Sequence, residues 1–171
     1  MTVDPKKQAD LVDALRNKAE AAAARNPAIA ELRAAAKPLL EEMRRRRQSG
    51  GAPFVLASAL YPDGKVQFLE PETSGELAGM PSLFASLIPL AKAGQIRAAA
   101  VGSFVERPNP ANPAVTAEFV QLHYEQLSGL AALSLMPVDL SVLQGGAAGA
   151  AGPAVALMGG KVAPRIFTRP A

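Results

Sequence analysis

The segment Pro62-Asp63-Gly64 constrains the fold of this chain more than any other, because it separates two apolar runs, residues 54–61 and 66–69. Proline fixes its own φ angle, aspartate offers a side-chain acceptor, and glycine tolerates the positive φ that closes a short loop. The segment therefore predicts a β-hairpin with a three-residue loop. Strands joined this closely are antiparallel, which directs the chain toward an antiparallel sheet.

One helix and three strands are predicted after this hairpin. Residues 81–92 have helical periodicity, and residues 96–107, 115–126 and 130–138 are strands whose connections are too short for parallel crossovers. The order predicts an α+β fold: a five-stranded antiparallel sheet with one helix between strands two and three. We expect the helices to lie on one face of this sheet.

Two details of the predicted strands concern burial and pairing. The apolar alternation of residues 115–126 changes phase near Phe119, which predicts a β-bulge if one face is buried throughout. Three prolines within residues 108–113 predict a loop, because proline cannot donate to a helix or a ladder. Five of the six phenylalanines are spread over successive elements and are interpreted as core residues: Phe54, Phe68, Phe84, Phe104 and Phe119.

Residues 1–50 are predicted to form an N-terminal helical hairpin attached to a core domain of residues 51–140. Asp4-Pro5 and Asn26-Pro27 each place a capping side chain before a proline, which indicates two helix starts. The second helix carries an apolar seam with spacings of three and four residues, typical of a helix that packs against a partner helix. The seam consists of Ile29, Leu32, Ala36, Leu39 or Leu40, and Met43.

Residues 141–171 are predicted to be a Gly/Ala-rich linker followed by a C-terminal arm. Residues 144–153 offer almost no side chains to bury, which is typical of a linker. Beyond it, residues 154–158 and 162–167 flank Gly159-Gly160 as a small hairpin. This arm could fold back onto the sheet edge or lie across a second subunit.

Over residues 53–140, the order of the elements resembles that of the profilin, longin and roadblock group of folds. The resemblance rests on element order alone and has no sequence motif behind it. It therefore implies a fold class and carries over no function and no site residue.

The composition excludes several classes of site. The chain has no cysteine and one histidine, which excludes disulfide frameworks, thiolate zinc sites, cysteine nucleophiles and any site with two imidazoles. Gly160-Lys161 matches the end of a phosphate-binding loop, but Val155 occupies the first glycine position and Val162 follows the lysine. We expect neither a metal ion nor a cofactor.

Two further observations concern membranes and location. The longest uncharged run, residues 140–160, contains six glycines and one proline, so we expect no membrane span. Residues 1–20 alternate charges with isolated apolar residues, unlike a secretory signal. A cytoplasmic location is therefore expected.

The most conspicuous charged run consists of Arg44, Arg45, Arg46 and Arg47. It is a candidate anion-binding site for nucleic-acid phosphates or an anionic lipid surface. The alternative is a solvated helix end, because cations complement the helix dipole there and Glu41 and Glu42 lie four residues before two of the arginines. No aromatic residues are interleaved, so the helix end is favoured and nucleic-acid binding is not expected.

The candidate catalytic grouping is Gln121, His123 and Glu125, which alternate onto one face of a predicted strand. A histidine beside a glutamate can act as a general base with its orienting group, and Gln121 would orient a substrate. The structural alternative is favoured, because polar neighbours on an open sheet face are ordinary and a lone histidine is more often structural.

No catalytic motif is present, and the sequence leaves open whether the protein is an enzyme. Its features favour a non-catalytic protein-interaction or regulatory module that acts as a homodimer. These features are the apolar stripes of the helical hairpin, an extendable sheet edge and the C-terminal arm. One alternative is a small-molecule-binding protein or enzyme that uses His123 and Glu125. The second is anion binding through the arginine run.

Overall fold

The computed structural model describes residues 26–72, 76–109, 112–139 and 160–168. It also describes six positions nearer the N-terminus, where the backbone is helical and the side chains are exposed: Asp10, Asp13, Ala14, Asn17, Lys18 and Ala21. The rest of the first predicted helix, the whole predicted linker and residues 154–158 of the predicted C-terminal hairpin lie outside the described residues.

The described strands form one antiparallel sheet in the order β2-β1-β3-β4-β5-β6. Their bounds are β1 (Leu56–Leu60), β2 (Val66–Leu69), β3 (Ala98–Asn109), β4 (Asn112–Gln126), β5 (Ala131–Pro137) and β6 (Gly160–Lys161). The α+β class and the antiparallel sheet are confirmed. The short strand β6 adds part of the C-terminal arm to the edge of the five predicted strands.

The predicted hairpin joins β1 and β2. The backbone N–H of Tyr61 donates to the carbonyl of Lys65 at 2.9 Å, and the N–H of Lys65 donates to the Asp63 carboxylate at 3.0 Å. Gly64 has a φ of 84°, which only glycine adopts without strain. The local chemistry of these residues therefore closes the loop as the sequence predicts.

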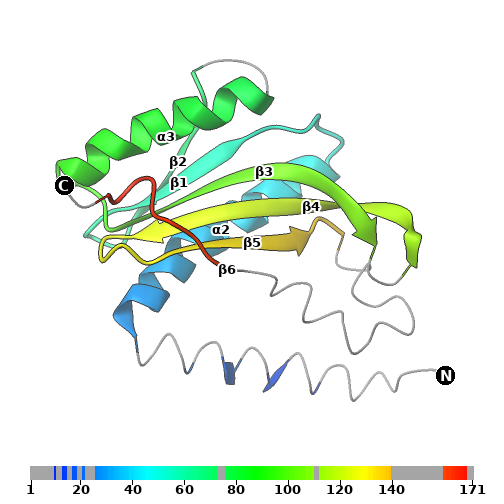
Figure 1. The fold of residues 1–171 in the computed structure, drawn as a ribbon, viewed down its shortest axis with the longest axis horizontal. Helices are drawn as coiled ribbons and strands as arrows, with labels where there is room; N and C mark the ends of the chain where they lie inside the picture. The colour runs from blue at the N-terminus through cyan, green and yellow to red at the C-terminus, as the bar shows by residue number, and fades with distance from the viewer. Residues whose placement is uncertain are drawn as a thin grey trace.

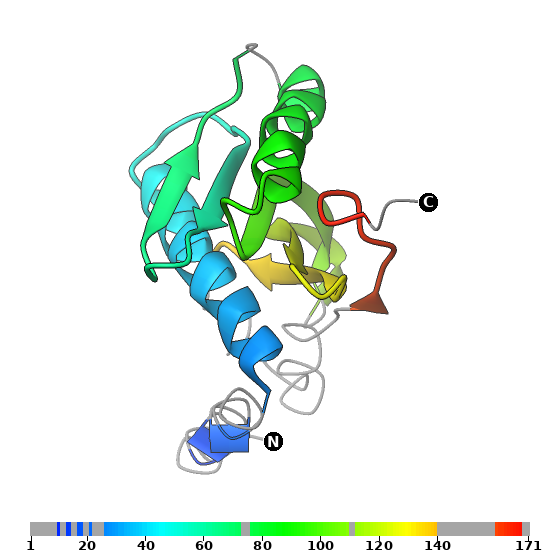
Figure 2. The same ribbon diagram turned by 90° about the vertical axis from the view of Figure 1, so that its left-hand side faces the viewer.

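Helices α2 (Pro27–Gln48) and α3 (Glu76–Lys92) cover opposite faces of the sheet (Figures 1 and 2). The expectation of helices on one face is therefore wrong. Asn26 caps α2 as predicted, since its side chain accepts from the N–H of Ala28 at 3.0 Å. In the described part of the chain, no helix is long and apolar enough to cross a membrane.

The two faces bury separate cores. The core on the α2 side contains Leu39, Met43, Leu56, Ala100, Phe104, Val120, Leu122 and Val138. The core on the α3 side contains Val55, Ala57, Ala59, Leu83, Phe84, Leu87, Ile96, Ala99, Val101, Ile166 and Phe167. Strand residues alternate between the two cores, so both sides of β1, β3 and β4 are buried over much of their length.

The β-bulge expected at Phe119 is not present. The β3–β4 register is regular from the Ala98–Gln126 pair to the Pro108–Thr116 pair, and it shifts only between Pro108 and Asn109. The phase change near Phe119 needs no bulge, because apolar residues on both faces of β4 have a core to enter.

The proline-rich loop is shorter than expected. Pro108 lies in β3 and Pro113 in β4, so the segment between the strands is confined to the residues after Asn109 and before Asn112. Here β3 and β4 form a two-stranded ribbon, since β1 and β5 pair with them only at the other end. A proline whose missing N–H faces away from the ladder removes no hydrogen bond.

The apolar seam of α2 packs on the sheet, a partner that the sequence did not predict. The buried residues of α2 are Leu32, Ala35, Leu39 and Met43. Ala35 is buried where the predicted seam has Ala36, and Ala36 and Ile29 are half-buried. Gly102 of β3 allows the close approach, because a Cβ atom there would lie 2.3 Å from the Met43 sulfur. An edge position limits burial elsewhere: Phe68 on β2 is 38% exposed, contrary to its assignment to the core.

Candidate functional site

Strand β4 brings His123 and Glu125 together on the α3 side of the sheet. Glu125 is fully buried and His123 is 8% exposed. The Nε2 atom of His123 lies 2.6 Å from Oε1 of Glu125. Gln121 is half-buried at the neighbouring position of the same strand face. The spacing predicted from sequence is therefore correct for this pair.

Small neighbours leave room for the Glu125 side chain. Its cross-strand partners are Ala99 on β3 and Ala131 on β5, both buried. Since alanine projects only one carbon from the sheet, the longer glutamate reaches past both partners. The alanines of these strands therefore create space above the sheet for a charged group and the segment that binds it.

Three consecutive backbone N–H groups of the C-terminal segment donate to Glu125. The N–H of Arg165 donates to Oε1 at 2.5 Å, and those of Ile166 and Phe167 donate to Oε2 at 2.7 and 2.9 Å. Both carboxylate oxygens are thus engaged by the chain's own backbone. Sequence reasoning missed this contact, because the partners lie about 40 residues away and the only signal was the predicted return of the arm to the sheet edge.

The hydrogen bonds keep Glu125 ionised in spite of its burial. Burial raises the pKa of Glu125, but the hydrogen bonds from His123 and from the three backbone N–H groups together lower it by more. The net shift of the pKa is downward. A buried carboxylate with this many donors is a charged anchor for the segment that supplies them.

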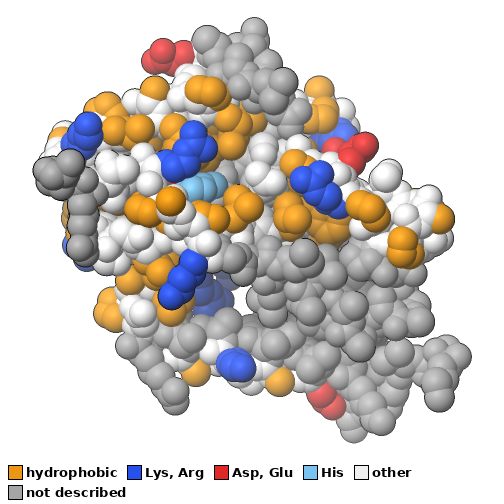
Figure 3. Space-filling model, in the orientation of Figure 1, with side chains coloured by type: hydrophobic (Ala, Val, Ile, Leu, Met, Phe, Trp, Pro, Cys, Tyr) orange, Lys and Arg blue, Asp and Glu red, His pale blue; other side chains and the backbone are white. Residues whose placement is uncertain are grey.

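Aromatic contacts complete the site. The rings of Phe84, on α3, and His123 meet edge to face with centroids 5.3 Å apart. The Arg165 guanidinium lies over the Phe84 ring, 4.1 Å from its centroid. Figure 3 shows the histidine, in pale blue, among hydrophobic side chains on this face.

This arrangement supports anchoring more directly than proton transfer. The pairing of Nε2 with Glu125 would also orient a general base, so it does not decide between the two roles. A base further needs space for a reacting atom beside its other ring nitrogen, and the ring of His123 is 8% exposed and packs against Phe84. One described pocket has a volume of about 200 Å³, and none of its lining residues belongs to this grouping. They are Pro53, Phe104, Val105, Glu106 and Glu118.

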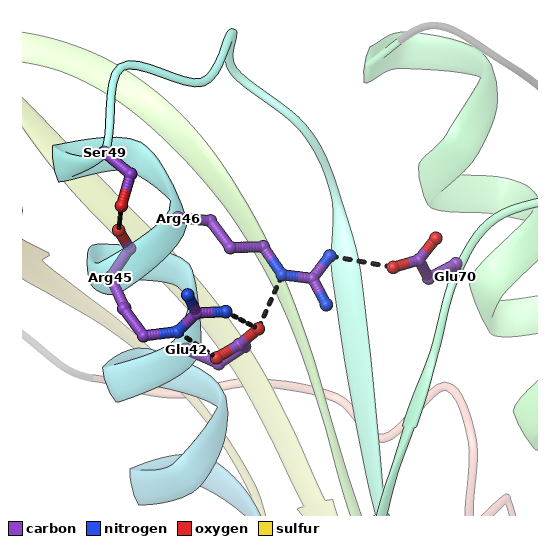
Figure 4. A network of polar contacts seen from close by, with 5 residues as sticks. All are labelled: Glu42, Arg45, Arg46, Ser49 and Glu70. Atoms are coloured by element: carbon purple, nitrogen blue, oxygen red, sulfur yellow. Dashed lines mark hydrogen bonds and ion pairs between the residues drawn. The ribbon is translucent and has the colours of Figure 1, made fainter.

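The arginine run ends α2, and its side chains bind acceptors within the chain. Figure 4 shows the contacts of Arg45 and Arg46. Arg45 donates to both oxygens of Glu42 at 2.9 and 2.7 Å. Arg46 links Glu42, at 2.6 Å, to Glu70 in the loop after β2, at 2.7 Å. The hydrogen bonds from Arg45 and Arg46 lower the pKa of Glu42 to about 2.

The other two arginines connect α2 to the sheet. Arg44 donates twice to the carbonyl of Pro137, at 3.0 and 2.7 Å. Arg47 pairs with Glu118 of β4 at 2.7 and 3.0 Å and also donates to the carbonyl of Gly51. The sequence predicted partners for this run only within the helix. The acceptors on the strands are 71 and 93 residues away and carry no local signal.

A metal site would need several ligand side chains close together. Among the described residues, no group of three or more His, Cys, Asp or Glu side chains could hold a metal ion.

Comparison of the chain with models of protein families, with curated proteins and with solved structures gives no match. The resemblance in element order to the profilin, longin and roadblock group therefore adds no residue to either candidate site. The function has to be argued from the geometry of this chain.

Proposed function

We propose that this chain is a non-catalytic protein-interaction module that acts as a cytoplasmic homodimer, with the free edge of β2 as the contact between its two copies. The observation that carries this proposal is the position of β2 at the end of the sheet, with β1 on one side and no described strand on the other. A free edge exposes backbone donors and acceptors that another strand can pair with.

The register of the hairpin identifies the groups that point outward. The pair Tyr61–Lys65 is hydrogen-bonded, and antiparallel pairs alternate between hydrogen-bonded and non-hydrogen-bonded. Val66 and Phe68 therefore occupy non-hydrogen-bonded positions opposite Leu60 and Ser58. Their N–H and C=O groups face the free edge, and the exposed ring of Phe68 lies beside them.

Two copies of this edge are complementary to each other. A two-fold axis beside β2 places each β2 antiparallel to its counterpart, so the same outward groups pair in both directions and the two sheets become one. The exposed Phe68 rings of both copies lose water at this contact. Such a contact needs no charged residue and no cofactor.

The test is the oligomeric state of Phe68→Pro, measured by light scattering at micromolar concentration. We expect the wild-type chain to have twice the mass of the 17.7 kDa monomer and Phe68→Pro to be monomeric, because proline removes an outward N–H without touching the ladder to β1.

The matched control is Phe68→Ala, which removes the ring and keeps the N–H. It should weaken the dimer less than Phe68→Pro does, and circular dichroism should show an unchanged fold for both variants. A wild-type chain that is monomeric under these conditions contradicts the proposal.

The geometry gives less support to the two alternatives. An enzyme using His123 and Glu125 would have to release the carboxylate from the three backbone donors that hold it. An anion bound to Arg44, Arg45, Arg46 or Arg47 would have to displace acceptors that the chain already supplies.

A further inference from the structure

The C-terminal segment, residues 160–168, binds to the core as an extended peptide would bind to a receptor. Its strand β6 adds to the free side of β5, where Lys161 pairs with Ala132, and the N–H of Val162 donates to the carbonyl of Ala131 at 3.2 Å. Pairing of an extended segment with a sheet edge is a recurring mode of peptide recognition.

Beyond β6, the segment is held by three separate contacts. Glu125 accepts three consecutive N–H groups, Arg165 lies over the Phe84 ring, and the side chains of Ile166 and Phe167 enter the core on the α3 side. Those two residues are 1% and 7% exposed. The core of the protein thus binds the backbone of the segment through Glu125, its arginine through the Phe84 ring, and its two apolar side chains through the core on the α3 side.

The connection between this segment and the sheet is far longer than its position requires. Residues 138–159 separate β5 from β6. To place Gly160 opposite Leu133, a hairpin would need a loop of about two to five residues after Pro137 and about four more that return along β5, which is far fewer than this connection contains. A tight turn therefore does not impose the docking. The contacts of the segment itself determine whether it stays bound.

We propose that the surface formed by the β5 edge, Glu125, His123 and Phe84 is a peptide-binding groove that accepts a segment of a partner protein in place of the chain's own C-terminal segment. The ligand is an extended segment with an arginine followed by an aliphatic and an aromatic residue. The groove lies at the opposite edge of the sheet from β2, so this site goes beyond the proposed homodimer contact.

The contacts also define what the ligand cannot contain. The three residues that donate to Glu125 need a backbone N–H, so proline is excluded at each of them. The residue before them makes no such donation, and proline occupies it here as Pro164. The resident segment competes with the partner, because its attachment to the same chain gives it a high effective concentration at the groove.

The experiment titrates a fluorescent peptide with the sequence of residues 161–168 into the full chain and follows its anisotropy. Every titration is carried out in the Phe68→Pro background, the parent chain here, which removes pairing between β2 edges and separates this test from that of the homodimer. Phe167→Ala weakens the resident segment and frees the groove. We expect this variant to bind the peptide at least about tenfold more tightly than the parent chain, since apparent affinity scales with the fraction of open groove.

Two matched controls address the anchor. A peptide with proline in place of the residue equivalent to Ile166 should bind about tenfold or more weakly, because it lacks the N–H that donates to Glu125. The original peptide should lose a similar factor in affinity for the Phe167→Ala chain that also carries Glu125→Gln, because the carboxylate that accepts these hydrogen bonds is removed. If Phe167→Ala loses its fold by circular dichroism, Arg165→Ala, an exposed position, replaces it and should also bind more tightly than the parent. The proposal is overturned if the parent chain and the Phe167→Ala variant bind the peptide equally well. It is also overturned if the proline peptide binds the Phe167→Ala variant as tightly as the original peptide does.

Discussion

Two glutamates of this molecule remain ionised for different physical reasons. Glu125 is fully buried, and donors from His123 and from three backbone groups compensate for its loss of water. Glu42 lies near the surface, where Arg45 and Arg46 donate to it. The donors to Glu42 lie three and four residues along its own helix and follow from the local sequence, whereas the backbone donors to Glu125 come from a segment about 40 residues away.

The lowered pKa of Glu42 predicts how stability depends on pH. The group titrates near 4.5 when unfolded and near 2 when folded, so its stabilisation is complete above about pH 4.5 and is lost as the pH falls toward 2. The difference in free energy of unfolding between wild type and Glu42→Gln should therefore shrink over this range. Urea unfolding between about pH 6 and pH 2.5 measures it, with Glu41→Gln as the control, and a difference independent of pH would contradict it.

At the scale of elements, the arginines at the end of α2 differ in the part of the fold that each one binds. Arg44 reaches the end of β5 and Arg47 reaches β4. Among the described residues, the side chain of Arg45 bonds within its own helix, to Glu42. The run thus holds a helix against a sheet, in addition to the favourable effect of cations at a helix C-terminus.

This difference predicts unequal effects of the same substitution within the run. Arg44→Met leaves the buried Pro137 carbonyl without its two donors and should lower the free energy of unfolding by about 1–3 kcal/mol. Arg45→Met removes a solvent-exposed pair and should change it little. Chemical denaturation of the two variants compares them directly. Equal losses would show that the carbonyl contact does not anchor the helix.

At the scale of the whole molecule, the sheet is covered by α2 on one face and by α3 with the C-terminal segment on the other. Ile166 and Phe167 therefore complete a core whose other members come from residues 55 to 101. The stability of the α3 side depends on the docking of the chain's C-terminal segment.

A double-mutant cycle tests this dependence. Glu125→Gln and Phe167→Ala should each lower the free energy of unfolding, and the double variant should lose less than the sum by about 1–3 kcal/mol, because either change alone already releases the segment. Glu125→Gln combined with Val120→Ala, a residue of the opposite core, is the control and should be additive within about 0.5 kcal/mol. Additivity in the first pair would mean that Glu125 and Phe167 stabilise the fold independently.

Most element positions could be read from local patterns. The start of α2 after Asn26, the turn at Pro62-Asp63-Gly64 and the strand that carries His123 depend on residues adjacent in sequence. Capping, turn geometry and side-chain alternation act over a few residues, so the sequence contains the whole signal. The pairing of His123 with Glu125 belongs here too, because alternate residues of a strand always share a face.

Only the tertiary structure decided which face each helix covers and which distant groups meet. The phase change at Phe119 fits either a bulge or two buried faces, and the choice depends on where α2 and α3 pack. The acceptor of Arg44 and the donors to Glu125 are 93 and 40 to 42 residues away from them. From α2 to β5, the sequence alone therefore determined the elements and their order. Packing decided which distant residues contact each other. Such contacts depend on shape and burial in three dimensions, and they produce no periodic pattern in the sequence.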